Sequence, residues 1–96
     1  MNVTLLYFDG CPNWEIADRR LSALADELGF EVDRRKVETS ADAEALGFRG
    51  SPTVLVDGRD AFADGDEPVG HACRVYETPD GPAGAPTETQ LRAVLT

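Results

Sequence analysis

Cys11 and Cys73 are the residues of this 96-residue chain whose side chains are best suited to covalent chemistry. Cys11 follows a β-rich apolar run that ends at Asp9-Gly10, and Pro12 after it suits the first turn of a helix. A thiol at a helix N-terminus lies at the positive end of the helix dipole, among unpaired backbone N–H groups that favour the thiolate. We therefore predict a reactive Cys11, and the alternative is a buried and inert thiol.

Three further side chains each have a functional and a structural interpretation. Trp14, one turn into the predicted helix, either shields the thiol, offers a surface to a substrate, or belongs to the core. His71, the only histidine, either tunes a thiolate or binds a metal, or is an ordinary loop residue. Cys73 is either a functional partner of Cys11 or a packed thiol in a short strand.

Composition excludes several classes of partner. Nine basic and eighteen acidic residues give a net charge of −9, which repels phosphates and anionic lipids, so we expect neither nucleic acid nor membrane as a partner. The longest unbroken apolar stretch, residues 5–8, is far shorter than the roughly 20 residues of a membrane span. Met1 leads directly into a strand-like run without a basic start or a cleavage site, so we expect a cytoplasmic protein. Cysteines in that compartment are more often catalytic, redox-active or metal-binding than structural.

No motif indicates a cofactor. The sequence lacks a Gly-rich phosphate loop and a paired-carboxylate motif, and residues 64–67 are acidic without the spacing of a calcium loop. Two cysteines and one histidine cannot complete a four-ligand zinc site. We therefore expect no cofactor and no metal site, and we interpret a set of aspartates as turn residues. These are Asp57, Asp60, Asp64 and Asp66.

The strands that must position the cysteines follow from hydrophobic patterning. Residues 3–8 are apolar on both parities, which is typical of a central strand covered on both faces. Residues 30–37 are highly charged, which suits an edge strand. Residues 53–56 and about 59–63 flank an Asp-Gly hairpin signal, so we predict an antiparallel pair.

Helix boundaries are marked by capping residues. The first helix is predicted from Pro12 to a stop at Gly29, and its apolar residues repeat at steps of three and four. These residues are Trp14, Ala17, Leu21, Leu24 and Leu28. Thr39 with Asp42 predicts a short second helix, and Thr87 with Gln90 predicts the last one.

The order of elements predicts one α/β domain over residues 1–96, with the sequence β-α-β-α-β-β-α. Residues 73–77 alternate in polarity and are a candidate extra strand, and residues 78–86, dense in Pro and Gly, are predicted to be irregular.

Two short motifs resemble the thioredoxin-like superfamily. Tyr7-Phe8-Asp9-Gly10-Cys11-Pro12-Asn13-Trp14 resembles its Cys-x-x-Cys or Cys-x-x-Ser segment, with Trp14 in the second position. Arg49-Gly50-Ser51-Pro52-Thr53 resembles the loop that carries that fold's cis-proline before the third strand. The chain is also similar to small bacterial thioredoxin-family proteins, some of them labelled alkylmercury lyase. The resemblance implies a thioredoxin-like three-layer fold with a mixed four-stranded sheet.

The resemblance also implies roles for residues. It implies a catalytic Cys11 and a substrate site that includes Pro12 and Trp14. It further implies a cis Ser51–Pro52 bond, with the backbone of Ser51 exposed beside the thiol for an extended peptide or a glutathione backbone, and with Ser51 and Pro52 holding the partner.

Cys73 is the candidate resolving thiol, because Trp14 cannot resolve a mixed disulfide. A fourth strand that returns antiparallel to the third carries Cys73 toward Cys11. We therefore predict that their Cα atoms lie close enough for a modest loop shift to join them, but we do not predict a formed bond, because the cytoplasm keeps most thiols reduced.

Three functions stay open at this point. In the first, Cys11 performs thiol–disulfide or related thiol chemistry on a disulfide- or thiol-containing protein or small molecule. In the second, Cys11 and Cys73 bind a soft metal or an organomercurial, because thiolates select soft ions. In the third, the fold is a non-catalytic interaction module in which Trp14 marks a lost redox site.

Overall fold

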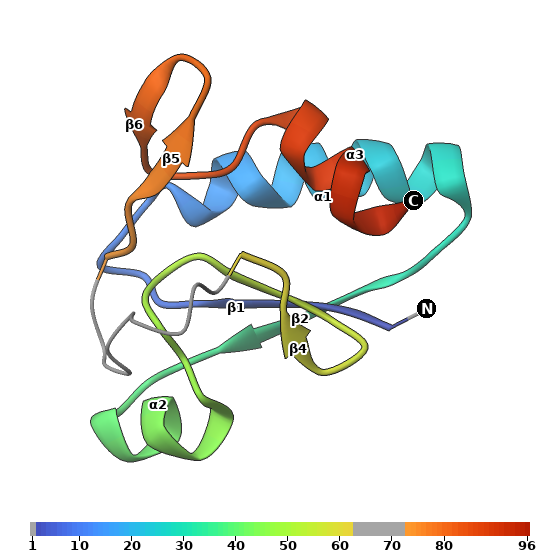
Figure 1. The fold of residues 1–96 in the computed structure, drawn as a ribbon. Helices are drawn as coiled ribbons and strands as arrows, with labels where there is room; N and C mark the ends of the chain where they lie inside the picture. Colours follow the sequence, from blue (N-terminus) through green and yellow to red (C-terminus); the bar gives the residue numbers. More distant parts are fainter. Residues whose placement is uncertain (1, 63–72) are drawn as a thin grey trace.

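A computed structural model describes residues 2–62 and 73–96 of the chain (Figure 1). Its elements follow in the order β1 (Val3–Tyr7), α1 (Trp14–Leu28), β2 (Val32–Lys36), α2 (Ser40–Leu46), β3 (Thr53–Val56), β4 (Arg59–Asp60), β5 (Tyr76–Thr78), β6 (Gly81–Ala83) and α3 (Glu88–Leu95). No helix in these two ranges is long and apolar enough to cross a membrane. Three residues with predicted roles, His71, Asp64 and Asp66, lie outside the described residues.

A mixed four-stranded sheet forms the centre of the protein, in the order β2-β1-β3-β4. β2 runs parallel to β1, whereas β3 is antiparallel to β1 and β4 is antiparallel to β3. The central place of β1 and the edge place of β2 confirm what their apolar and charged patterns predicted. In β2 only Val32 is partly buried, and the charged residues after it are exposed at the edge.

Helices cover both faces of this sheet and make three layers (Figure 1). Successive side chains of a strand point to opposite faces. Val3 and Leu5 of β1 therefore pack in one cluster with residues of α1 and α3, and Leu6 packs in a second cluster with Ala43 of α2. The predicted α/β class and the mixed four-stranded sheet are confirmed.

Helix ends lie close to the predicted positions. α1 begins at Trp14 rather than at Pro12, and it ends at Gly29 in the left-handed conformation. The hydroxyl of Thr39 accepts a hydrogen bond from the Asp42 N–H at the start of α2. At the start of α3 the side chains and backbones of Thr87 and Gln90 form the predicted reciprocal capping box.

The two hairpins differ from the prediction in the extent of their strands. The β3–β4 turn is the predicted Asp-Gly turn, with positive φ at both Asp57 and Gly58. β4 is shorter than predicted because the side chain of Asp60 accepts the Phe62 N–H at 3.0 Å, which turns the chain away from the ladder. The expectation that residues 78–86 are irregular is wrong for residues 78 and 81–83, because β6 pairs with β5 there in a second small sheet, and it is confirmed for residues 79–80 and 84–86.

One exposed ion pair joins α1 to α3 and gives a first testable prediction. The hydrogen bond from Arg92 to Glu27 lowers the pKa of the Glu27 carboxyl below its ordinary value of 4.5. The pair therefore adds stability above that value and loses it as pH falls through the lowered folded-state pKa. We expect an NMR titration of Glu27 to show a midpoint below 4.5, and we expect Arg92→Ala to raise it. An unchanged midpoint in this variant would contradict the contact.

Candidate thiol–disulfide site

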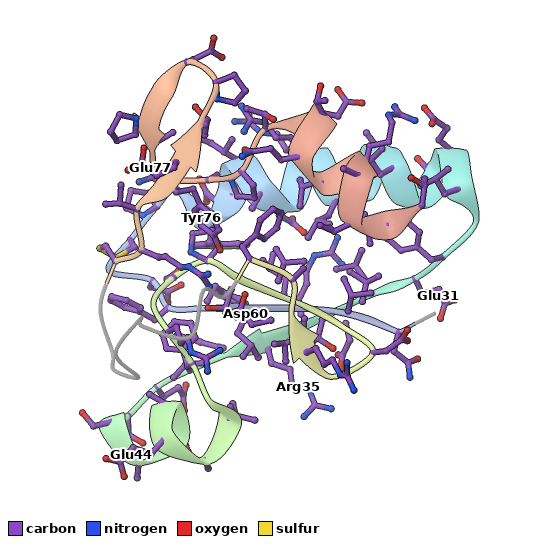
Figure 2. The ribbon with its side chains drawn as sticks, viewed as in Figure 1. Glu31, Arg35, Glu44, Asp60, Tyr76 and Glu77 are labelled. Carbon is purple, nitrogen blue, oxygen red and sulfur yellow. A yellow bond between two sulfur atoms is a disulfide. The ribbon has the colours of Figure 1, made fainter. Side chains whose placement is uncertain are left out.

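Cys11 and Cys73 form a disulfide across a sequence separation of 62 residues, with their Cα atoms 5.7 Å apart. The distance confirms the predicted proximity of the two cysteines. The bond itself goes beyond the sequence prediction, which placed the cysteines near one another without joining them. In Figure 2 the yellow sulfur atoms lie beside the chain that leads into the β5–β6 hairpin.

A tight turn between β1 and α1 holds Cys11. Its N–H donates to the Phe8 carbonyl at 3.3 Å. The N–H groups of residues 14–16 donate to the carbonyls of residues 11–13 over 3.1–3.4 Å. The expectation that Cys11 lies among unpaired helical N–H groups is therefore wrong for these three groups, because the turn before the helix already uses them. The dipole of α1 still points its positive end toward the turn.

The two cysteines differ in exposure. Cys11 is 1% exposed and belongs to the buried apolar residues, whereas Cys73 is exposed. The cause is their position, since Cys11 lies between the sheet and α1 and Cys73 lies on the segment that leads to β5. Of the two residues, Cys73 is therefore the one in contact with solvent.

Ser51 and Pro52 lie next to the disulfide, and the bond between them is cis. Ser51 is 1% exposed, and its hydroxyl accepts the Phe8 N–H at 3.2 Å. Its carbonyl accepts the Arg74 N–H at 3.0 Å, and Ser51 forms a parallel β-bridge with Cys73. The expected exposure of the Ser51 backbone is therefore corrected, because the chain's own residues 73–74 occupy the place expected for an extended peptide.

Pro12 follows Cys11 in the turn, and Trp14 is the first residue of α1. Pro12 is exposed and Trp14 is half-buried. The Trp14 ring stacks on Tyr7, with 4.2 Å between centroids and 25° between planes, and it packs against the cluster that holds α1 to the sheet. These contacts favour the interpretation of Trp14 as a core residue.

A buried ion pair that no sequence pattern predicted lies beside the disulfide. The carboxylate of Asp60 and the guanidinium of Arg74 are 2.7 Å apart, with 2% and 5% of their side chains exposed. Arg49 adds a second, longer contact to Asp60 at 3.7 Å. The interpretation of Asp60 as a turn residue is therefore wrong, since it lies in β4 and is buried.

Tyr76 completes this cluster. Its hydroxyl donates to the Pro52 carbonyl, and the Arg74 guanidinium lies 4.6 Å from the centre of its ring. In Figure 2, Tyr76 is labelled at the base of the β5–β6 hairpin and Asp60 at the level of the sheet below it. The alternation of residues 73–77 contained the signal for this arrangement, because Arg74 and Tyr76 share one parity and both are buried.

The backbone at Gly50 allows the close approach of this segment. Gly50 has a φ of +110°, which side-chain-bearing residues rarely adopt. A Cβ atom there would lie 2.8 Å from the Cβ of Arg74, which is closer than packed carbon atoms come. Glycine at this position therefore lets residues 73–74 lie directly on the cis-proline loop.

Two hollows lie at opposite ends of β1. The smaller, of about 270 Å³, borders the turn before Cys11 and is lined by Phe8, Asp9, Gly10, Lys36, Val37 and Glu38. The ammonium of Lys36 lies 2.7 Å from Asp9, and this hydrogen bond raises the pKa of Lys36. The larger, of about 650 Å³, lies around Asn2 and Gly58, away from the disulfide.

No known protein family, curated protein or solved structure matches this chain. Its class is therefore defined by its own architecture, an α/β protein with a mixed four-stranded sheet. Its candidate site is a disulfide between the turn after β1 and the segment before β5.

Proposed function

We propose that this chain is a thioredoxin-like thiol–disulfide exchange protein in which Cys11 and Cys73 cycle between disulfide and dithiol. The observation that carries the proposal is the pairing of these cysteines at a Cα distance of 5.7 Å. The strand order β2-β1-β3-β4 and the cis-proline directly before β3 support the thioredoxin-like assignment.

The reaction needs no cofactor. A thiolate from a partner attacks one sulfur of the disulfide, a mixed disulfide forms, and the second sulfur leaves as a thiolate. A second partner thiol then attacks the mixed disulfide and releases the partner as a disulfide. The protein gains two electrons and the two partner thiols lose them, and the reverse sequence oxidises the protein.

Two features favour exchange over a purely structural disulfide. One sulfur belongs to the exposed residue Cys73, so a partner reaches it without unfolding. The chain also has its own apolar clusters on both faces of the sheet, so its fold does not depend on a covalent staple. In the cytoplasm, the compartment that we propose, such a disulfide is transient and catalytic or redox-sensing.

The proposal is tested by equilibrating the folded protein with glutathione buffers of graded oxidation and counting free thiols after an acid quench. We expect both cysteines to titrate together in a two-electron transition while circular dichroism shows the native fold. Cys73→Ser should abolish this intramolecular transition. A disulfide that is reduced only after denaturant unfolds the protein would overturn the proposal and favour a structural role for the bond.

The same pairing supports a second candidate function, the binding of a soft cation by the reduced protein. Two thiolates this close suit a two-coordinate soft ion. Among the described residues no cluster of three or more metal-ligating side chains exists, so the two cysteines are the ligands that we propose. We expect the reduced protein to bind one Hg²⁺ ion and Cys73→Ser to weaken this binding sharply. Equal binding by both proteins would contradict this function.

A further inference from the structure

The two sulfurs of the disulfide have different roles. We propose that Cys73 is the sulfur that an incoming thiol attacks, and that Cys11 is the buried leaving and resolving thiol. The inference rests on the proposed exchange function and deepens it. It also reverses the sequence prediction, in which Cys11 attacks and Cys73 resolves.

Exposure favours attack on Cys73. Exchange proceeds in line, so the attacking sulfur must approach the sulfur that it joins from outside the existing bond. Cys11, in the turn that precedes α1, is 1% exposed, and Cys73 is exposed. An incoming thiolate therefore reaches Cys73 without any movement of β1, α1 or the cis-proline loop.

Cys11 is the better placed of the two cysteines to leave as a thiolate. When Cys73 is attacked, the electron pair of the broken bond remains on the sulfur of Cys11. That sulfur lies in the turn at the positive end of α1, which stabilises a negative charge. Cys73 has no comparable position, because it precedes a short strand, β5.

Non-covalent contacts hold Cys73 in place after the disulfide opens. The Arg74 N–H donates to the Ser51 carbonyl, the Arg74 guanidinium pairs with Asp60, and the Tyr76 hydroxyl donates to the Pro52 carbonyl. None of these contacts uses a sulfur atom. Reduction therefore leaves Cys73 beside Cys11, ready to reform the disulfide and expel the partner.

These contacts also define the partner. Residues 73–74 already pair with the backbone of Ser51. The backbone of an incoming partner therefore cannot form strand-like hydrogen bonds with the Ser51 carbonyl. Among the described residues near Cys73, Val75 presents an apolar side chain that is 68% exposed. This environment suits a small thiol that needs contact with one sulfur and little else.

Reduction of the disulfide by a small thiol takes place in two exchange reactions. A small thiolate R–S⁻ forms a bond to Sγ of Cys73 while the bond from Cys73 to Cys11 breaks, and Cys11 becomes a thiolate. A second thiolate R–S⁻ then attacks the sulfur of the bound R group and releases R–S–S–R, leaving Cys73 as a thiolate. Both thiolates of the protein take up protons from solvent according to pH.

The test maps the mixed disulfide in the wild-type protein. Oxidised native protein is mixed with excess 2-mercaptoethanol, quenched with acid at graded times, alkylated and analysed by peptide mass spectrometry. We expect at least tenfold more 2-mercaptoethanol adduct on Cys73 than on Cys11. An equal or reversed ratio would overturn the inference and leave the exchange function intact, whereas native protein that forms no adduct would overturn both.

A second measurement tests the anchoring in the reduced protein. Hydrogen exchange of the Arg74 amide, which bonds to Ser51, is compared between oxidised and reduced protein. The Gly29 amide, which bonds to Ala25 at the far end of α1, is the matched control. We expect protection of Arg74 to fall by less than about tenfold on reduction. A fall to the rate of a free chain, with Gly29 unchanged, would show that Cys73 leaves the site and would overturn the inference.

Discussion

Replacement of Asp60 by asparagine is expected to destabilise the protein by about 3–5 kcal/mol, as measured by urea unfolding of the oxidised protein. The substitution keeps the shape of the side chain and removes its charge. Arg74, of which 5% of the side chain is exposed, then keeps a buried positive charge without its partner. The effect is large because burial removes the water that would otherwise stabilise that charge.

The matched control is Asp33→Asn, the same substitution in an ion pair at the surface. Asp33 and Arg35 are 57% and 59% exposed, so solvent screens their attraction and the expected change is about 0–1 kcal/mol. Equal effects of the two substitutions would contradict the assignment of Asp60 as a buried charge partner.

A double variant keeps the prediction measurable if Asp60→Asn alone unfolds the protein. Arg74→Met removes the unpaired charge and fills similar space, so we expect Asp60→Asn with Arg74→Met to be more stable than Asp60→Asn alone. Strictly additive losses would show that the two side chains do not interact.

Local patterns predicted much of the fold. The two-sided apolar run of β1, the charged edge of β2 and the capping box of α3 are each contained within a few neighbouring residues. The Asp-Gly turn between β3 and β4 is equally local. Where one short segment determines the conformation, the sequence is enough to predict it.

The rest depends on contacts between distant segments. Asp60 follows a turn in the sequence, and only the contact with Arg74, in the segment before β5, makes it a buried ion-pair partner. The β5–β6 hairpin contains Pro82 and Gly81, which predict a loop, yet its strands pair. Tertiary contacts override local preference at these positions.

Some features of the candidate site were predictable from neighbouring residues, and others depend on contacts between distant segments. The position of Cys11 after β1 was predictable from neighbouring residues, and its distance to Cys73 followed from the assumed return of the fourth strand. The burial of Cys11 and the use of the Ser51 carbonyl by Arg74 were not predictable, because both depend on where residues 73–74 lie against the cis-proline loop.

Reduction of the disulfide is expected to lower the free energy of unfolding by about 4 kcal/mol, because the bond closes a long loop and restricts the unfolded chain. The measurement compares urea unfolding of the oxidised protein, the reduced protein and Cys73→Ser. Cys73 is exposed, so a serine there adds no buried polar group, and we expect this variant to match the reduced wild-type protein.

Cys11→Ser separates the cross-link from the environment of the buried sulfur. This variant loses the same cross-link, but it also places a hydroxyl at a position that is 1% exposed. A buried hydroxyl without a partner costs about a further 1–3 kcal/mol, so Cys11→Ser should be less stable than Cys73→Ser by that amount. Equal stabilities of the two variants would contradict the difference in burial, and with it the reason for assigning Cys73 as the attacked sulfur.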